Sequence, residues 1–159
     1  MRDDSGSPRL TLLAFALAAL VLSAVPLPHV LDLLRPDFLL LTIVWFALMM
    51  PRTAGLAFAW AAGLALDAFH GVALGENALA FVVIAYLVHR FHLRMRMFPL
   101  SQQTLVVAGL LLIDQILLWA IDGFTGHPVN DWVRWLPVAT GTALWPLLTG
   151  VLGRATVRR

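Results

Sequence analysis

The sequence has no cysteine and no lysine, and it has few charged residues of any kind. Without cysteine, the chain forms no disulfide and carries no thiol nucleophile or thiolate metal ligand. All of its 11 basic residues are arginine, and charged residues make up 13% of the chain. A soluble domain carries about 25% charged residues. The composition therefore excludes an ordinary water-soluble domain and is typical of a membrane protein.

Apolar side chains fill the sequence instead, at 60% of the 159 residues and with a mean hydropathy of +0.85. The isoelectric point near 10.4 would suit a nucleic-acid-binding protein. However, the arginines lie in short stretches between apolar runs and form no soluble basic face. Such arginines commonly mark the cytoplasmic side of a membrane protein and contact anionic lipid headgroups. We therefore expect membrane lipids, and no nucleic acid, among the partners.

Six apolar runs are candidates for transmembrane helices, each of which needs roughly 20 apolar residues. They cover residues 10–25, 38–50, 53–69, 75–88, 103–120 and 135–152. Proline, glycine and polar residues separate the runs, and no connection is long enough for a soluble domain. The first run lacks a good small-x-small cleavage site before Pro26, which favours an uncleaved helix over a signal peptide. We expect residues 1–159 to form a single integral membrane domain.

The second run, residues 38–50, is too short for a simple crossing. It makes about 20 Å of helix, whereas the hydrocarbon core is roughly 30 Å thick. Either the helix begins nearer Leu31, with a break at Pro36, or it enters the bilayer without crossing. The arginines favour six crossings. In that arrangement every arginine except Arg35 and Arg134 lies on the side of the membrane that holds the N-terminus. That side then holds Arg2, Arg9, Arg52, Arg90, Arg94, Arg96, Arg154, Arg158 and Arg159.

The acidic residues are distributed the other way. Six crossings put five of them in the outer loops, namely Asp32, Asp37, Glu76, Asp122 and Asp131. Arginine is generally enriched in cytoplasmic loops. We therefore expect an all-α bundle of six transmembrane helices with both termini in the cytoplasm.

The third run carries a row of small residues at a spacing of four. The row consists of Gly55, Ala59, Gly63, Asp67 and Gly71. Small residues at this spacing let a neighbouring helix backbone approach closely, so the row predicts a helix-packing face. Asp67 lies at its outer end. It could be protonated, accept hydrogen bonds from the turn at residues 70–77, pair with an arginine, or serve as a substrate or proton site.

Two polar residues, Asp114 and Gln115, lie in the middle of the fifth run. The residues three and four positions from Asp114 are all leucine, so its own helix offers no hydrogen-bond partner. The carboxyl group must then face the bundle interior or another protein, where a structural hydrogen bond and a relay role both remain open. In the sixth run, Pro146 predicts a kink, and Gly141 four residues before Trp145 suits close packing.

The sequence gives little indication of a catalytic site. The sequence has no H-E-x-x-H, no G-x-S-x-G and no glycine-rich phosphate loop. Its 5 histidines fall in predicted loops or at helix ends and form no ligand set. Asp67 and Asp114 could form an aspartyl dyad like that of signal-peptidase-like membrane proteases, but two aspartates are a weak pattern. We expect no enzymatic activity, no cofactor and no metal.

Several segments together resemble the rod shape-determining protein MreD family. They are "RPDFLLLTIVWFALMMP" followed by Arg52, "GLALDAFHGVALGENALAFVVIAYLV", "RMFPLSQQTLVV", and "LWPLL" before a basic tail. The likeness runs from about Arg35 to the C-terminus. Its most specific parts are the block Asp67, Gly71 and Gly75, and the Trp145-Pro146 pair. Ser101 stands before Gln102 and Gln103, where many relatives have an aromatic residue.

The resemblance implies a function that composition does not. It implies a non-enzymatic component of the bacterial inner membrane that works in cell elongation with MreC, MreB, RodA and its partner transpeptidase. It also implies the six-helix fold of the substrate-binding subunits of energy-coupling vitamin importers, which makes a small-molecule or lipid-binding transport subunit the alternative. The candidate partner contacts are Asp67, Glu76 and Asn77 outside and Arg90, Arg94 and Arg96 inside, while Asp114 and Gln115 would satisfy a polar group across the bundle.

Overall fold

The protein is an all-α, polytopic membrane protein. The computed structural model describes residues 8–25, 28, 34–72, 74–125 and 132–157. Within them the chain forms α1 (Pro8–Ala24), α3 (Phe38–Met49), α4 (Leu56–His70), α5 (Glu76–Arg96), α6 (Leu100–Thr125), the 3-10 helix η1 (Trp132–Trp135) and α7 (Leu136–Val157). Three segments are long and apolar enough to cross a bilayer, namely Glu76–Arg96, Leu100–Phe124 and Trp132–Thr156.

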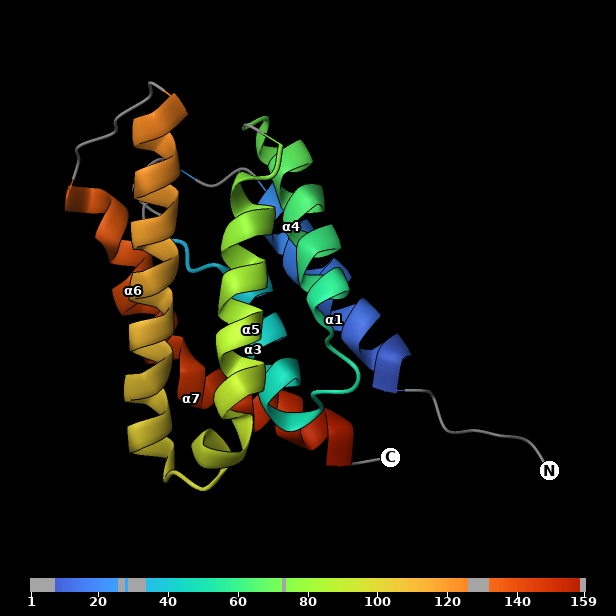
Figure 1. The fold of residues 1–159 in the computed structure, drawn as a ribbon. Coiled ribbons are helices and arrows are strands. Elements are labelled where there is room, and N and C mark those ends of the chain that lie inside the picture. Colours follow the sequence, from blue (N-terminus) through green and yellow to red (C-terminus); the bar gives the residue numbers. More distant parts are fainter. Residues whose placement is uncertain (1–7, 26–27, 29–33, 73, 126–131, 158–159) are drawn as a thin grey trace.

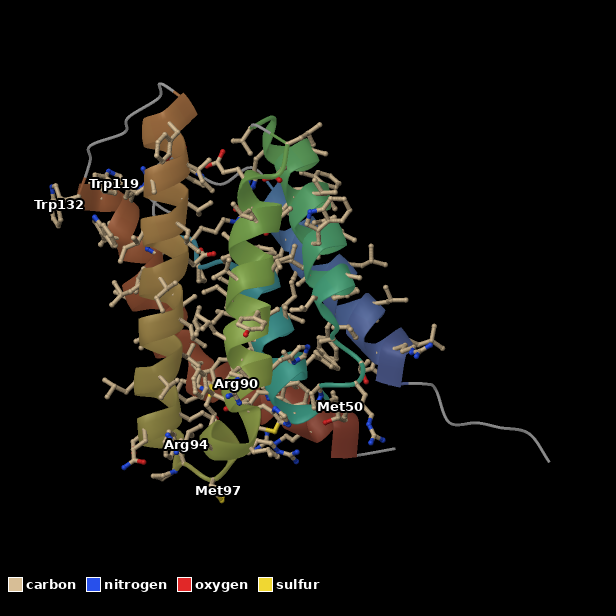
Figure 2. The ribbon with its side chains drawn as sticks, in the orientation of Figure 1. Met50, Arg90, Arg94, Met97, Trp119 and Trp132 are labelled. Atoms are coloured by element: carbon tan, nitrogen blue, oxygen red, sulfur yellow. The ribbon has the colours of Figure 1, made fainter. Side chains whose placement is uncertain are left out.

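The helices alternate in direction, so that α1 begins and α7 ends at the same end of the bundle (Figure 1). We call this the arginine-rich end, because it holds Arg52, Arg90, Arg94, Arg96 and Arg154. The opposite end, called the acidic end, holds Asp67, Glu76 and Asp122. Figure 2 shows Arg90 and Arg94 at the first end and Trp119 and Trp132 at the second. Five residues used above to assign sides lie outside the described residues: Arg2, Arg158, Arg159, Asp32 and Asp131.

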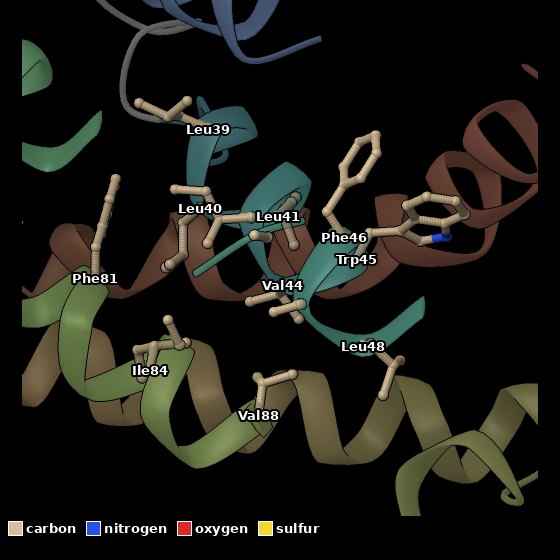
Figure 3. Close-up of a cluster of buried hydrophobic side chains, with 14 of the residues drawn as sticks. Leu39, Leu40, Leu41, Val44, Trp45, Phe46, Leu48, Phe81, Ile84 and Val88 are labelled. Atoms are coloured by element: carbon tan, nitrogen blue, oxygen red, sulfur yellow. The ribbon is translucent and has the colours of Figure 1, made fainter. Parts of the chain in front are cut away.

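The short second run forms α3, which lies in the centre of the bundle. Every residue from Leu39 to Leu48 is buried, and all but Thr42 are apolar. A helix that is apolar on all sides belongs in an interior. Helices α1, α5 and α7 pack against it, and the α5 contribution is visible in Figure 3. Its 12 residues span about 18 Å, so α3 alone does not cross a bilayer.

Two helices extend well beyond the predicted spans. The expected run 75–88 continues to Arg96 in α5, and the run 103–120 extends from Leu100 to Thr125 in α6. Hydropathy falls at the first charged residues, but arginine and methionine are good helix formers. The helix therefore continues where the apolar run stops, and it carries the α5 arginines on its last turns.

The small-residue row of α4 packs at its centre, not along its length. A Cβ atom built at Gly63 would lie 2.4 Å from the Cα of Ala78 and 2.6 Å from its amide nitrogen, so α4 and α5 touch backbone to backbone there. The expectation that Gly55 and Gly71 also pack is wrong, because a Cβ at either position meets nothing within 4 Å. Gly55 precedes α4 as its N-cap, and Gly71 ends it with a positive φ of 65°.

Two predicted features of α7 lie close together. A Cβ at Gly141 would lie 2.9 Å from a methyl group of Leu111 on α6, so this glycine does permit close packing. Trp145 is buried and the adjacent Pro146 is exposed, and α7 continues through the proline to Val157.

Candidate functional site

The connection between α4 and α5, at the acidic end, is organised around the Asp67 carboxylate. Asp67 is 0% exposed. Its Oδ2 accepts a hydrogen bond from the backbone N–H of Gly75 at 2.8 Å. Its Oδ1 accepts two more, from the backbone N–H of Asn77 at 3.0 Å and from Asn77 Nδ2 at 2.7 Å. Among the alternatives that the sequence left open for Asp67, the structure shows hydrogen bonding to this turn.

The local sequence explains why Asp67 takes this role. Helix α4 ends at Gly71 in the left-handed conformation, and Gly75 reaches a φ of 106° just before α5. A glycine at the N-cap of α5 provides no side-chain acceptor for the unpaired N–H groups of the first turn. Asp67, from the preceding helix, provides that acceptor, and its negative charge is favourable at a helix N-terminus.

Beside this turn lies a group of charged side chains that we call the Glu76 cluster: Glu76, Asp122 and Arg134. Arg134 Nη2 lies 2.6 Å from Asp122 Oδ2, and the two side chains are 18% and 17% exposed. The Glu76 carboxyl group lies beside the Asp122 side chain. The cluster joins the start of α5, the end of α6 and η1. The sequence placed these residues on one side but gave no sign of their pairing, because a turn of unknown geometry separates Asp122 from Arg134.

Buried Asp67 and Asn77 do not lie on the surface where a partner would bind. Asn77 is nine-tenths buried and donates hydrogen bonds from its backbone N–H and its Nδ2 to Asp67. Glu76 is the half-buried member of the three predicted outer contacts. Of the three predicted outer contacts, Asp67 and Asn77 therefore hold the turn together, and Glu76 is the one that the turn leaves accessible to a partner.

Asp114 lies inside the bundle, as predicted, at 2% exposure. Its Oδ1 has no hydrogen-bond partner among the described residues. Gln115 makes the backbone bonds of α6, but its side chain forms no hydrogen bond within the same part of the chain. Asp37 lies close enough to Asp114 for the two carboxyl groups to interact electrostatically. Asp37, which the sequence placed in an outer loop, lies in the connection directly before α3, where it caps that helix and accepts a hydrogen bond from the Leu40 N–H at 2.8 Å.

A second polar contact joins three helices towards the arginine-rich end, and the sequence did not predict it. Trp145 Nε1 on α7 donates to Gln103 Oε1 on α6 at 3.4 Å, and Gln103 Nε2 donates to the Met95 carbonyl oxygen on α5 at 3.4 Å. Both side chains are buried, with Gln103 5% exposed. The adjacent Gln102 and Gln103 could have indicated a polar contact within an apolar segment, but only the structure shows that Gln103 is the one that faces the interior.

Arg90, Arg94 and Arg96 are exposed on the last turns of α5, at the opposite end from the Glu76 cluster. The structure therefore forms two separate polar surfaces, one at each end. Within the described residues, no three histidine, aspartate or glutamate side chains gather in a way that could hold a metal ion.

Two apolar grooves open on the sides of the bundle. One, of about 410 Å³, lies between α1 and α7 over α3 and is lined by residues such as Phe15, Phe38 and Leu148. The other, of about 320 Å³, lies between α5 and α6 and includes Phe91, Arg94 and Ile113.

Comparison with known proteins gives consistent results. The family model described as rod shape-determining protein MreD matches residues 5–154. The rod shape-determining protein MreD of Haemophilus influenzae (strain ATCC 51907 / DSM 11121 / KW20 / Rd) is 26% identical over 136 residues, which cover 86% of this chain and 84% of that protein. No solved structure matches the chain.

Proposed function

The chain belongs to the rod shape-determining protein MreD family, and we propose that it is a non-enzymatic scaffold that binds MreC in the bacterial inner membrane. As a member of this family it is a component of the cell-shape machinery. In the proposal, RodA, its partner transpeptidase and MreB join the same larger complex. The family match over residues 5–154 is the observation that carries the proposal.

The arrangement of polar groups supports a scaffold over an enzyme. The buried Asp67 carboxylate is occupied by three donors from its own chain, so it holds a shape and is not poised to react. By ordering the turn between α4 and α5, Asp67 helps to position the Glu76 cluster at the acidic end. There, charged side chains from α5, α6 and η1 lie within reach of another protein. We propose that this cluster is one contact for MreC.

Co-purification tests the contact. MreC is captured from detergent with the wild-type chain, with Glu76→Gln, or with Arg154→Gln, which removes an exposed charge at the opposite end. We expect Glu76→Gln to reduce MreC capture about five-fold, which corresponds to the roughly 1 kcal/mol that marks an energetically important interface residue. Arg154→Gln should capture MreC like the wild type. Equal capture by all three proteins, at matched expression, would show that MreC does not contact the cluster.

A small-molecule or lipid-binding membrane subunit is the second candidate, and Asp114 favours it. One oxygen of its buried carboxyl group meets no donor from the described residues, and such a group in a membrane-protein interior is a functional candidate. This alternative predicts a small compound that copurifies at one copy per chain and is released on denaturation. Mass spectrometry of the denatured supernatant would detect it, and its absence would leave the scaffold as the better proposal.

A further inference from the structure

The groove between α5 and α6 combines an apolar interior with one charged side chain. Aromatic and aliphatic groups line it, among them Phe91 and Phe98 from the α5 side and Val106 and Ile113 from α6. Arg94 is the charged residue of the lining. Arg94 lies in the last turn of α5, so the guanidinium sits where the groove approaches the arginine-rich end.

A missing side chain keeps the groove open. Gly109, in the middle of α6, lines the groove, and a Cβ atom built there meets nothing within 4 Å. The contrast with Gly63 is direct, because a Cβ at that position would collide with the Ala78 backbone. Gly109 is therefore not required for packing within the chain, and the space beside it is free for another molecule.

The charge at the mouth of the groove has no acidic partner in the described part of the chain. Arg94 forms no ion pair there, and the described acidic residues are Asp37, Asp67, Glu76, Asp114 and Asp122, none of which belongs to the arginine-rich end. Arg90, one turn earlier on α5, adds positive charge beside it. An occupant of this site needs an anionic group next to an apolar chain.

We propose that this groove binds an anionic phospholipid. The phosphate accepts hydrogen bonds from the Arg94 guanidinium, and one acyl chain lies along α6 past Gly109. Arginine near a helix end extends its charged group to the membrane interface, and basic pockets between transmembrane helices recognise anionic lipid headgroups. The α1–α7 groove differs, because every described residue of its lining is uncharged and it offers no headgroup contact. The proposal depends neither on MreC binding nor on which side of the membrane the arginine-rich end faces.

Native mass spectrometry of the full chain tests the site. The protein is released from mixed micelles that contain equal amounts of dioleoylphosphatidylglycerol and dioleoylphosphatidylcholine, and the ratio of the two lipid adducts is measured. Arg94→Gln removes the proposed headgroup contact. Arg96→Gln is the matched control, because it removes another exposed charge two residues away that does not line the groove. Gly109→Leu fills the groove, and Gly150→Leu makes the same change in open space on α7.

We expect the wild type to retain phosphatidylglycerol in preference to phosphatidylcholine. One cationic side chain near an anionic surface contributes about a five-fold effect, so Arg94→Gln should lose about that much of the preference while Arg96→Gln keeps it. Gly109→Leu should lose adducts of both lipids, and Gly150→Leu should behave as the wild type. Thermal unfolding in lipid-free detergent confirms that each variant is folded.

Two results would overturn the proposal. If Arg94→Gln and Arg96→Gln reduce the preference equally, the arginines act as a diffuse charge and no headgroup site exists. If folded Gly109→Leu retains both lipids at the wild-type level, no acyl chain occupies the groove.

Discussion

Single residues at the α4–α5 contact show how little space separates these two helices. Gly63 sits against the backbone of Ala78, and Asp67, one turn further along α4, accepts the N–H groups at the start of α5. The close approach and the hydrogen bonds therefore reinforce each other. Small residues of this kind let backbones meet in a membrane, where no hydrophobic force favours one helix pair over another.

Gly63→Ala should lower stability although it adds only a methyl group. The Cβ would lie 2.4 Å from a backbone carbon, so one helix must shift. Overpacking of this kind costs about 1–3 kcal/mol. Gly150→Ala makes the same change where nothing lies within 4 Å and should be neutral or slightly stabilising. Thermal unfolding in detergent measures both variants, and equal melting would mean that α4 and α5 are not in backbone contact.

At Asp67, asparagine and leucine should have graded effects. Asparagine keeps one acceptor oxygen in nearly the same shape, so it retains the Asn77 contacts and loses the Gly75 bond. We expect Asp67→Asn to destabilise by about 1 kcal/mol and Asp67→Leu by more, because leucine leaves buried N–H groups unpaired at about 1–3 kcal/mol each.

Cell width and MreC co-purification at matched expression give the functional readout for the same two variants. A structural carboxylate predicts that Asp67→Asn supports rod shape at least in part. If Asp67→Asn is stable and still captures MreC yet leaves cells without rod shape, the ionisable group itself is needed and the scaffold proposal fails.

At the scale of elements, the order of the six helices was predictable and their roles were not. Apolar runs separated by proline and glycine located every helix within a few residues at its start. Hydropathy did not place α3 at the centre, because lipid and a protein interior are equally apolar to a leucine side chain. The row from Gly55 to Gly71 correctly predicted a helix-packing face on α4. The spacing alone does not show that Gly63 contacts the neighbouring helix while Gly55 and Gly71 cap the ends of α4.

Gln103 is the element-scale link that a single substitution can test. Gln103→Leu removes the acceptor for Trp145 Nε1 and the donor to the Met95 carbonyl, both buried. We expect destabilisation of about 1–3 kcal/mol, the cost of unsatisfied buried polar groups. Gln102→Leu is the matched control, since its side chain is exposed on the same helix. Unfolding curves that shift equally for the two variants would contradict a specific role for Gln103.

At the scale of the whole molecule, the two ends carry opposite charge. The described arginines other than Arg35 and Arg134 gather where α1 begins and α7 ends, and the Glu76 cluster lies at the other end. The sequence predicted this separation because positive charge is generally retained on the cytoplasmic side. It did not predict the Asp37–Asp114 proximity, which arises only when α3 begins inside the bundle.

Reporter fusions test the orientation of the molecule. An activity reporter is placed after Arg96, between α5 and α6, or at the C-terminus. Both positions belong to the arginine-rich end and should read as cytoplasmic. A fusion after Thr125, at the end of α6, is the opposing control and should read as periplasmic. A periplasmic signal from either of the first two fusions would reject the proposed orientation.

The central position of α3 also has a consequence for biosynthesis. This helix leaves the ribosome before α5 and α7 have been made, yet those later helices form much of its surroundings. A helix of 12 residues is too short to anchor itself independently across a bilayer. Membrane insertion is therefore complete only when the later helices close around α3.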